Sequence, residues 1–142
     1  MNEAPLISVI IPSFFSENHI GECIESVLKQ SYQKFELIIV DGMSKDKTIN
    51  IIKKYQLKDE RIKLIPNPND NGPAQARSYG IKHSCGEYIA FIDSDDLWLE
   101  KKLELQLTFM INNGYKFSFT RYKKMYPDGS LSRASLGGHN SN

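Results

Sequence analysis

The chain has 142 residues, a formal net charge of +1, 40% hydrophobic residues and 25% charged residues. This composition is that of an ordinary globular domain that needs no staples, and it gives no reason to expect a nucleic acid partner. The two cysteines show neither metal-ligand spacing nor a disulfide framework, so a reducing cytoplasm is the expected location. The chain start does not read as a signal peptide, and no stretch has the length of a membrane span, so any membrane contact is expected to be peripheral.

Buried strands alternate with amphipathic helices along most of the chain. The elements are predicted, in chain order, as strand 6–12, helix 17–30, strand 35–41, helix 46–57, strand 61–66, helix 73–83, strand 88–93, helix 99–112 and strand 116–120. From Pro127 on the chain is polar and rich in Gly, Ser and Asn. We therefore expect one domain over residues 1–126 and a loosely ordered tail over residues 127–142.

This alternation predicts an α/β fold, a Rossmann-like and mostly parallel sheet flanked by helices. In such sheets ligands bind beyond the carboxyl ends of the strands. Three of the predicted strands end in notable residues, namely Pro12, Asp41 and Asp93. We expect these ends to lie on one edge of the sheet and to face one crevice.

An acidic run, Asp93-Ser94-Asp95-Asp96, follows the predicted strand at 88–93. Carboxylates this close repel each other, and a hard divalent cation relieves that repulsion. Mn²⁺ or Mg²⁺ binds through one or two carboxylates and completes its shell with water and substrate phosphates. The alternative is a solvated turn that caps the next helix, for which a single aspartate would suffice.

Two further positions are candidates for nucleotide binding. Asp41 ends a strand and could accept hydrogen bonds from a base or ribose, although Asp41-Gly42 could equally be a tight turn with Ser44 or Asp46 as a helix cap. Arg77 lies in the first turns of a helix with small neighbours, where a guanidinium could hold a diphosphate; the alternative is an ordinary surface arginine.

Near the end of the chain, Tyr122, Lys123, Lys124 and Tyr126 mix aromatic and basic side chains. This segment could contact a phosphate-bearing acceptor or a membrane surface, or it could be a solvated strand end.

Taken together, these segments resemble the family-2 glycosyltransferases of the A-type fold. The resemblance runs from about Ile7 to Tyr122 in the family's order and spacing, and its ordered blocks make it specific. The matching blocks are Ser8–Phe14, Glu25–Tyr32, Glu36–Gly42 with Ser44, Asp46 and Thr48, Asn71-Gly72 with Ala76-Arg77 and Gly80-Ile81, and Gly86–Asp96 followed by Trp98 and Lys102–Glu104.

The resemblance implies a transferase that moves a sugar from a nucleotide-sugar donor, usually a UDP-sugar, to a glycan or lipid-linked glycan acceptor with inversion. It implies polysaccharide or lipopolysaccharide synthesis at the inner face of the cell membrane. The implied nucleotide-binding residues are Pro12, Phe14, Asp41, Asn71, Arg77 and Asp93, and the implied ligands of Mn²⁺ or Mg²⁺ are Asp95 and Asp96. The catalytic base of the family lies in an acceptor-binding half, expected beyond Asn142.

Some positions depart from the family pattern. Phe15 stands where many members have Asn, Gly42 where many have a second acid, and Met43 where a small or polar residue is usual. Two other interpretations stay open at this point. One is a truncated metal- and nucleotide-binding remnant without transfer activity. The other is a magnesium-dependent phosphotransferase with Asp93 as nucleophile, which leaves the other matching blocks unexplained.

Overall fold

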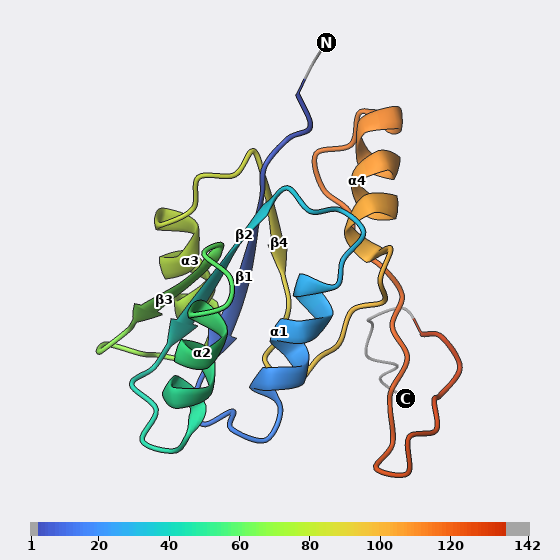
Figure 1. The fold of residues 1–142 in the computed structure, drawn as a ribbon. Helices are drawn as coiled ribbons and strands as arrows, with labels where there is room; N and C mark the ends of the chain where they lie inside the picture. Colours follow the sequence, from blue (N-terminus) through green and yellow to red (C-terminus); the bar gives the residue numbers. More distant parts are fainter. Residues whose placement is uncertain (1–2, 136–142) are drawn as a thin grey trace. The chain divides into compact units, whose positions relative to one another are not determined.

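The computed structural model describes residues 3–135, and Figure 1 shows how their elements follow one another. The elements are β1 (Ile7–Ser13), α1 (Ile20–Leu28), β2 (Phe35–Asp41), α2 (Thr48–Gln56), β3 (Ile62–Pro66), α3 (Pro73–Lys82), β4 (Tyr88–Phe91) and α4 (Lys102–Asn113). The chain divides into two compact units, residues 1–103 and residues 104–142. The first unit contains the whole sheet.

The sheet has four parallel strands in the order β3-β2-β1-β4. The central strands β1 and β2 are buried along their full lengths, which explains their nearly continuous runs of Ile, Leu and Val. Ser13 pairs with Asp41, and Asp41 pairs with Pro66, so the carboxyl ends of three strands lie level with one another. The parallel α/β architecture predicted from the sequence is confirmed.

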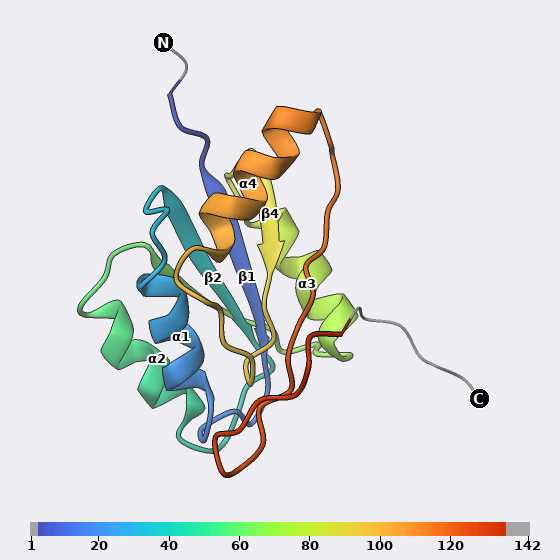
Figure 2. The same ribbon diagram turned by 90° about the vertical axis from the view of Figure 1, so that its right-hand side faces the viewer.

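Helices cover both faces of this sheet. Figure 2 shows α1 and α2 on one face and α3 on the other. α3 packs onto β1 and β2 through Ala76 and Gly80, its two buried residues, which lie against Ile10 and Val40. A side chain at Gly80 would begin 2.6 Å from the Ile10 Cγ2 atom, so glycine allows the helix to approach the strand this closely.

A polar network fixes the amino edge of the sheet. The buried carboxylate of Glu36 accepts hydrogen bonds from the hydroxyl of Ser8 at 2.5 Å, the ammonium of Lys63 at 2.6 Å and the backbone N–H of Cys85 at 2.6 Å. Burial raises the pKa of the Glu36 carboxyl, but these hydrogen bonds lower it further than burial raises it. The network ties β1, β2 and β3 to the loop between α3 and β4.

Three predicted helices begin later than expected. The helices predicted at 17–30, 46–57 and 99–112 begin at Ile20, Thr48 and Lys102. The delay at Lys102 has a clear cause in the side chain of Gln30. Its amide group donates to the Leu99 carbonyl at 2.8 Å and accepts from the Leu103 N–H at 3.0 Å, so the backbone at Leu99 is held outside the helix.

The strand predicted at 116–120 is wrong. Strands need a paired neighbour, and the described part of the second unit offers two isolated antiparallel bridges, Tyr122 with Ser135 and Met125 with Leu131. The predicted domain boundary at residue 126 stays a prediction, and residues 136–142 of the predicted tail lie outside the described residues. Between residues 3 and 135, none of the helices combines the length and the apolar character that crossing a bilayer requires.

Candidate nucleotide site

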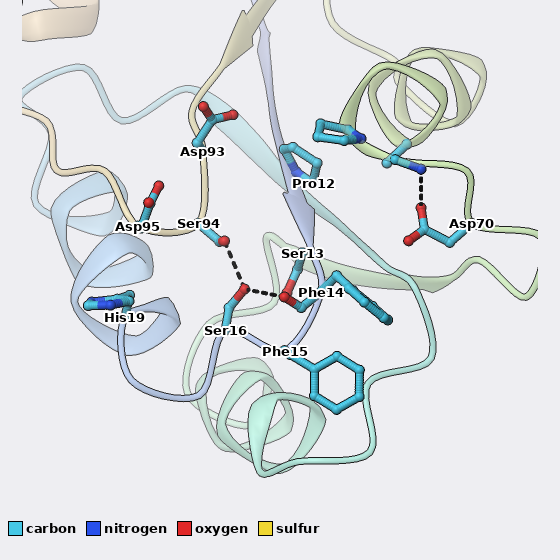
Figure 3. Close-up of a pocket in the computed structure, with 13 residues that line it drawn as sticks. Pro12, Ser13, Phe14, Phe15, Ser16, His19, Asp70, Asp93, Ser94 and Asp95 are labelled. Carbon is cyan, nitrogen blue, oxygen red and sulfur yellow. Dashed lines mark hydrogen bonds between the residues drawn. The ribbon is translucent and has the colours of Figure 1, made fainter.

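A cavity of about 450 Å³ opens at the carboxyl edge of the sheet. It lies where the connections from β1 and β4 leave the sheet on either side of the reversal in strand order, the place where open α/β sheets bind ligands. Figure 3 shows the side chains around it. Its lining residues are Pro12, Ser13, Phe14, Phe15, Ser16, His19, Asp70, Gly72, Pro73, Ala76, Asp93, Ser94 and Asp95.

Aromatic side chains form one side of the cavity. Pro12 lies near the end of β1, and Phe14 and Phe15 follow the strand with about half of each side chain exposed. Their rings meet edge to face with centroids 4.5 Å apart. The backbone of Phe15 has a φ of 47°, a left-handed conformation that a bulky residue adopts only under constraint. This side of the cavity therefore offers apolar planar surface held in a strained loop.

The acidic run forms a second side. Asp93 and Asp95 line the cavity, and the hydroxyl of Ser94 lies 2.8 Å from that of Ser16, within hydrogen-bonding distance. The thiol of Cys23 donates to the Asp93 carbonyl at 3.4 Å. These bonds fix the path of the run, so its carboxylates are presented to the cavity from an anchored turn.

Negative charge accumulates around this run. Burial, and then the neighbouring Asp95 and Asp93, raise the pKa of the Asp96 carboxyl. Burial, followed by the same group of aspartates, raises the pKa of Cys23 to about 12. On the other flank, the Arg77 guanidinium lies 2.6 Å from Asp93 and offsets part of the charge. The run thus repels further anions and attracts cations.

Asp70 supplies a third side that sequence reasoning missed. Figure 3 shows it apart from Asp93 and Asp95, with Pro12 between them. Its carboxylate accepts a hydrogen bond from the N–H of Gly72 at 3.3 Å, and it fills the space beside Gly42 that a larger residue would take. The available signal was its position two residues before Gly72, in the loop that follows β3 and leads into α3.

The predicted site residues fall into three groups. Four of them, Pro12, Phe14, Asp93 and Asp95, line the cavity. Three others are sequence neighbours of lining residues without lining it themselves, namely Asn71, Arg77 and Asp96, of which Arg77 contacts Asp93. Asp41 is buried behind the cavity, and both of its carboxylate oxygens accept hydrogen bonds from Ser44, one from its N–H and one from its hydroxyl, each at 2.8 Å. Their roles toward a ligand stay predictions.

The oxygen ligands fit a hard divalent cation that shares its shell with a substrate. Among residues 3–135, no three His, Cys, Asp or Glu side chains gather closely enough to enclose a metal by themselves. Asp95 and Asp96 could supply one or two carboxylates, which is the usual protein share for Mg²⁺ bound together with substrate phosphates. Asp95 and Asp96 therefore fit a metal site that is open to substrate and water.

The fold defines this protein as a doubly wound α/β protein, with a cavity at the edge of the sheet where such folds bind ligands. The family model described as glycosyl transferase family 2 matches residues 8–138, and the chain belongs to that family. Membership confirms the family resemblance seen in the sequence.

Named relatives support the same assignment. The Bacillus subtilis protein TuaG, named as a teichuronic acid biosynthesis glycosyltransferase, is 43% identical over 91% of this chain and 51% of its own. The Escherichia coli UDP-Glc:alpha-D-GlcNAc-diphosphoundecaprenol beta-1,3-glucosyltransferase WfgD is 42% identical over 83% of this chain and 46% of its own. The chain therefore spans about half the length of these relatives.

A solved structure confirms the A-type fold. The structure of residues 1–349 of S. aureus TarS in complex with UDP-GlcNAc superimposes with a TM-score of 0.71 and 33% sequence identity. The match covers 76% of this chain and 32% of the TarS chain.

Proposed function

We propose that this chain is the donor-binding part of a glycosyltransferase that moves a sugar from a UDP-sugar to a glycan or lipid-linked glycan, with inversion at the transferred carbon. The observation that carries the proposal is a cavity in which an aromatic loop faces a cluster of carboxylates. The names of relatives support the donor and acceptor classes, since WfgD is named for UDP-Glc and a diphosphoundecaprenol acceptor and TarS was solved with UDP-GlcNAc.

In this proposal the nucleoside lies on the aromatic side of the cavity. Pro12 and Phe14 border the base, with Asp70 at its edge and Asp93 toward the ribose. Asn71, the neighbour of Asp70 in the chain, is assigned to the nucleotide site although it does not line the cavity. Arg77, held beside Asp93, binds the diphosphate through charge-assisted hydrogen bonds. Asp41, buried at the end of β2, is assigned to the same site although it does not line the cavity.

The divalent metal, Mn²⁺ or Mg²⁺, is assigned to Asp95 with Asp96 beside it. When bound there, the ion supplies positive charge that stabilises the leaving diphosphate. The protein's own part is to hold these carboxylates in place, which the contacts of Ser94 and Cys23 with neighbouring elements accomplish. The acceptor and its activating base are not assigned to any residue of the cavity.

Acting on a lipid-linked acceptor would place the enzyme at the cytoplasmic face of the membrane, held by peripheral contacts. The aromatic and basic segment around Tyr122 and Lys123 is exposed and is the segment we assign to such contacts.

Calorimetry with UDP tests the proposal. We expect binding in the presence of Mn²⁺ and at least tenfold weaker binding when EDTA replaces the metal. Asp95→Ala should abolish most of this metal dependence, whereas Glu87→Ala, which removes an exposed acid outside the cavity, should leave it intact. Equal affinity with Mn²⁺ and with EDTA would remove the metal from the proposal, and absence of any UDP binding would overturn the function itself.

A further inference from the structure

The loop that follows β1 is held by an unusual set of hydrogen bonds. Three consecutive backbone N–H groups, those of residues 15–17, each donate to a different side chain, two of them in the loop that follows β2 and one at the first residue of α2. The bonds run from Phe15 N to Ser44 Oγ at 2.9 Å, from Ser16 N to Thr48 Oγ1 at 2.8 Å and from Glu17 N to Asp46 Oδ2 at 3.4 Å. We call Ser44, Asp46 and Thr48 the amide clamp.

The amide clamp is itself fixed from behind. Asp41, with 1% of its surface exposed, accepts the N–H and the hydroxyl hydrogen of Ser44 on its two carboxylate oxygens. Because the hydroxyl donates to Asp41, its lone pairs are free to accept from Phe15. At the other end of the clamp, Asp46 accepts the N–H of Thr48 at 3.0 Å, which orients Asp46 at the start of α2.

The loop needs such support because its own conformation is unfavourable. Phe15 has a left-handed backbone, and its side chain is half exposed, so packing in the core does not compensate for the strain. The same loop carries Phe14 on the cavity wall and reaches the acidic run through Ser16 and Ser94. A loop that relaxed would shift the aromatic wall relative to the carboxylates.

We propose that the amide clamp holds residues 14–17 in the conformation that accepts the nucleoside of the donor, and that Asp41 is a positioning residue that acts through Ser44. The inference rests on the proposed function for the identity of the ligand. It assigns to Asp41 an indirect role, since its carboxylate is buried, does not line the cavity and already accepts a hydrogen bond from Ser44 on each oxygen. It also makes Ser44 and Thr48, which do not line the cavity, determinants of nucleotide affinity.

The opposite edge of the sheet offers a matched control. Ser8 is fully buried and donates to the buried carboxylate of Glu36, just as Ser44 donates to Asp41, but it lies near the other end of β1. Ser8→Ala and Ser44→Ala therefore remove the same kind of hydrogen bond at opposite ends of the same two strands. A purely structural role for Ser44 predicts similar consequences for both variants.

The first measurement uses no nucleotide. Amide hydrogen exchange, followed by NMR, should show protected N–H groups at Phe15 and Ser16 in the wild-type protein. Ser44→Ala should accelerate exchange at Phe15, and Thr48→Val should accelerate it at Ser16, each at least tenfold. Thr48→Ser keeps the accepting hydroxyl and should restore protection. Unprotected amides in the wild type would overturn the clamp whatever the protein binds.

The second measurement compares ligands that share a diphosphate. We expect Ser44→Ala and Thr48→Val to weaken UDP binding with Mn²⁺ at least tenfold while affinity for pyrophosphate with Mn²⁺ stays within about twofold of the wild type. Thr48→Ser should recover UDP affinity, and Ser8→Ala should lower the melting temperature without changing UDP affinity. Equal losses for UDP and pyrophosphate, or unchanged UDP affinity in Ser44→Ala, would overturn the positioning role. Confirmed clamp protection with no UDP binding in the wild type would instead refute the proposed function.

Discussion

Arg77 and Asp93 show how one contact can matter for binding and little for stability. Their ion pair of 2.6 Å joins side chains that are 34% and 50% exposed, and pairs of this kind contribute little to folding because water screens them. Arg77→Ala should therefore leave the melting temperature nearly unchanged. It should weaken UDP binding roughly tenfold to hundredfold, since a charge-assisted hydrogen bond contributes about 1.5–3 kcal/mol.

Calorimetry with UDP and a thermal melt check this prediction side by side. Lys82→Ala, which removes an exposed cation from the last turn of the same helix, serves as the control. Affinity unchanged in Arg77→Ala would make Arg77 an ordinary surface arginine.

At the scale of single residues, the sequence predicted several residues that line the cavity, but it did not predict the hydrogen bonds and contacts around them. The acidic run and Pro12 were predicted at one crevice, and Pro12, Asp93 and Asp95 do line one cavity. The family resemblance implied that Asp41 contacts the nucleotide, and that role stays a prediction; the sequence could not reveal that Ser44 donates a hydrogen bond to each of its carboxylate oxygens. Asp70 was missed because its side chain lies beside Gly42, 28 residues earlier in the chain, only once the protein is folded.

At the scale of elements, the packing of α3 on β1 gives a prediction with an unusual sign. Replacing glycine by alanine inside a helix ordinarily stabilises it by about 1 kcal/mol. Gly80→Ala should instead destabilise the protein by about 1–3 kcal/mol, because the new methyl group would meet Ile10 at 2.6 Å and Val40 at 3.3 Å. Urea unfolding measures the difference, with Ser78→Ala on the exposed side of the same helix as the control. A gain in stability for Gly80→Ala would show that α3 does not pack against Ile10 as closely as the 2.6 Å distance indicates.

The network around Glu36 makes the sheet sensitive to acid. The pKa of the Glu36 carboxyl in the folded protein lies below its ordinary value of 4.5, so its contribution to stability is present above about pH 4.5. That contribution is lost as the pH falls through the lowered pKa. Glu36→Gln should cost about 1–3 kcal/mol at pH 7 because it removes a buried charged acceptor, and the variant should lose less stability than the wild type on further acidification.

Urea unfolding at pH 7 and pH 3 tests this pH dependence. Glu22→Gln, at an exposed position of α1, is the control and should parallel the wild type at both values. A Glu36→Gln variant whose stability falls as steeply as that of the wild type below pH 4.5 would contradict the prediction.

The bounds of an element were predictable where the pattern of apolar residues alone determines them. The strand at Phe35–Asp41 was predicted with its observed bounds because a continuous apolar run between polar segments admits little else. The start of α4 was not, because the side chain of Gln30, about 70 residues earlier in the chain, engages the backbone at Leu99 and Leu103. No local pattern contains such a long-range bond.

For the whole molecule, we expect the 142-residue chain to bind a nucleotide sugar but to transfer it poorly. Inverting transfer needs a base within hydrogen-bonding distance of the acceptor hydroxyl. After the acidic run, the carboxylates among the described residues are Glu100, Glu104 and Asp128. Asp128 is engaged within its own turn, accepting the N–H and hydroxyl of Ser130 at 2.9 and 2.6 Å.

Incubation with radiolabelled UDP-sugars and cell-envelope acceptors measures transfer directly. Binding without turnover is the expected result. Robust turnover that is lost in Asp128→Asn would contradict this prediction and would identify Asp128 as the base.

The burial of Cys23 and the exposure of Cys85 have a practical consequence for observing this protein in solution. A maleimide dye should react at Cys85 and spare Cys23, giving one fluorophore per molecule without any engineered cysteine. Cys85 lies at the amino edge of the sheet beside Glu36, at the other end of the strands from the nucleotide cavity. A dye there would report unfolding of the sheet while leaving the ligand site unobstructed, and an intact Cys23 would remain as an internal measure of whether the core has opened.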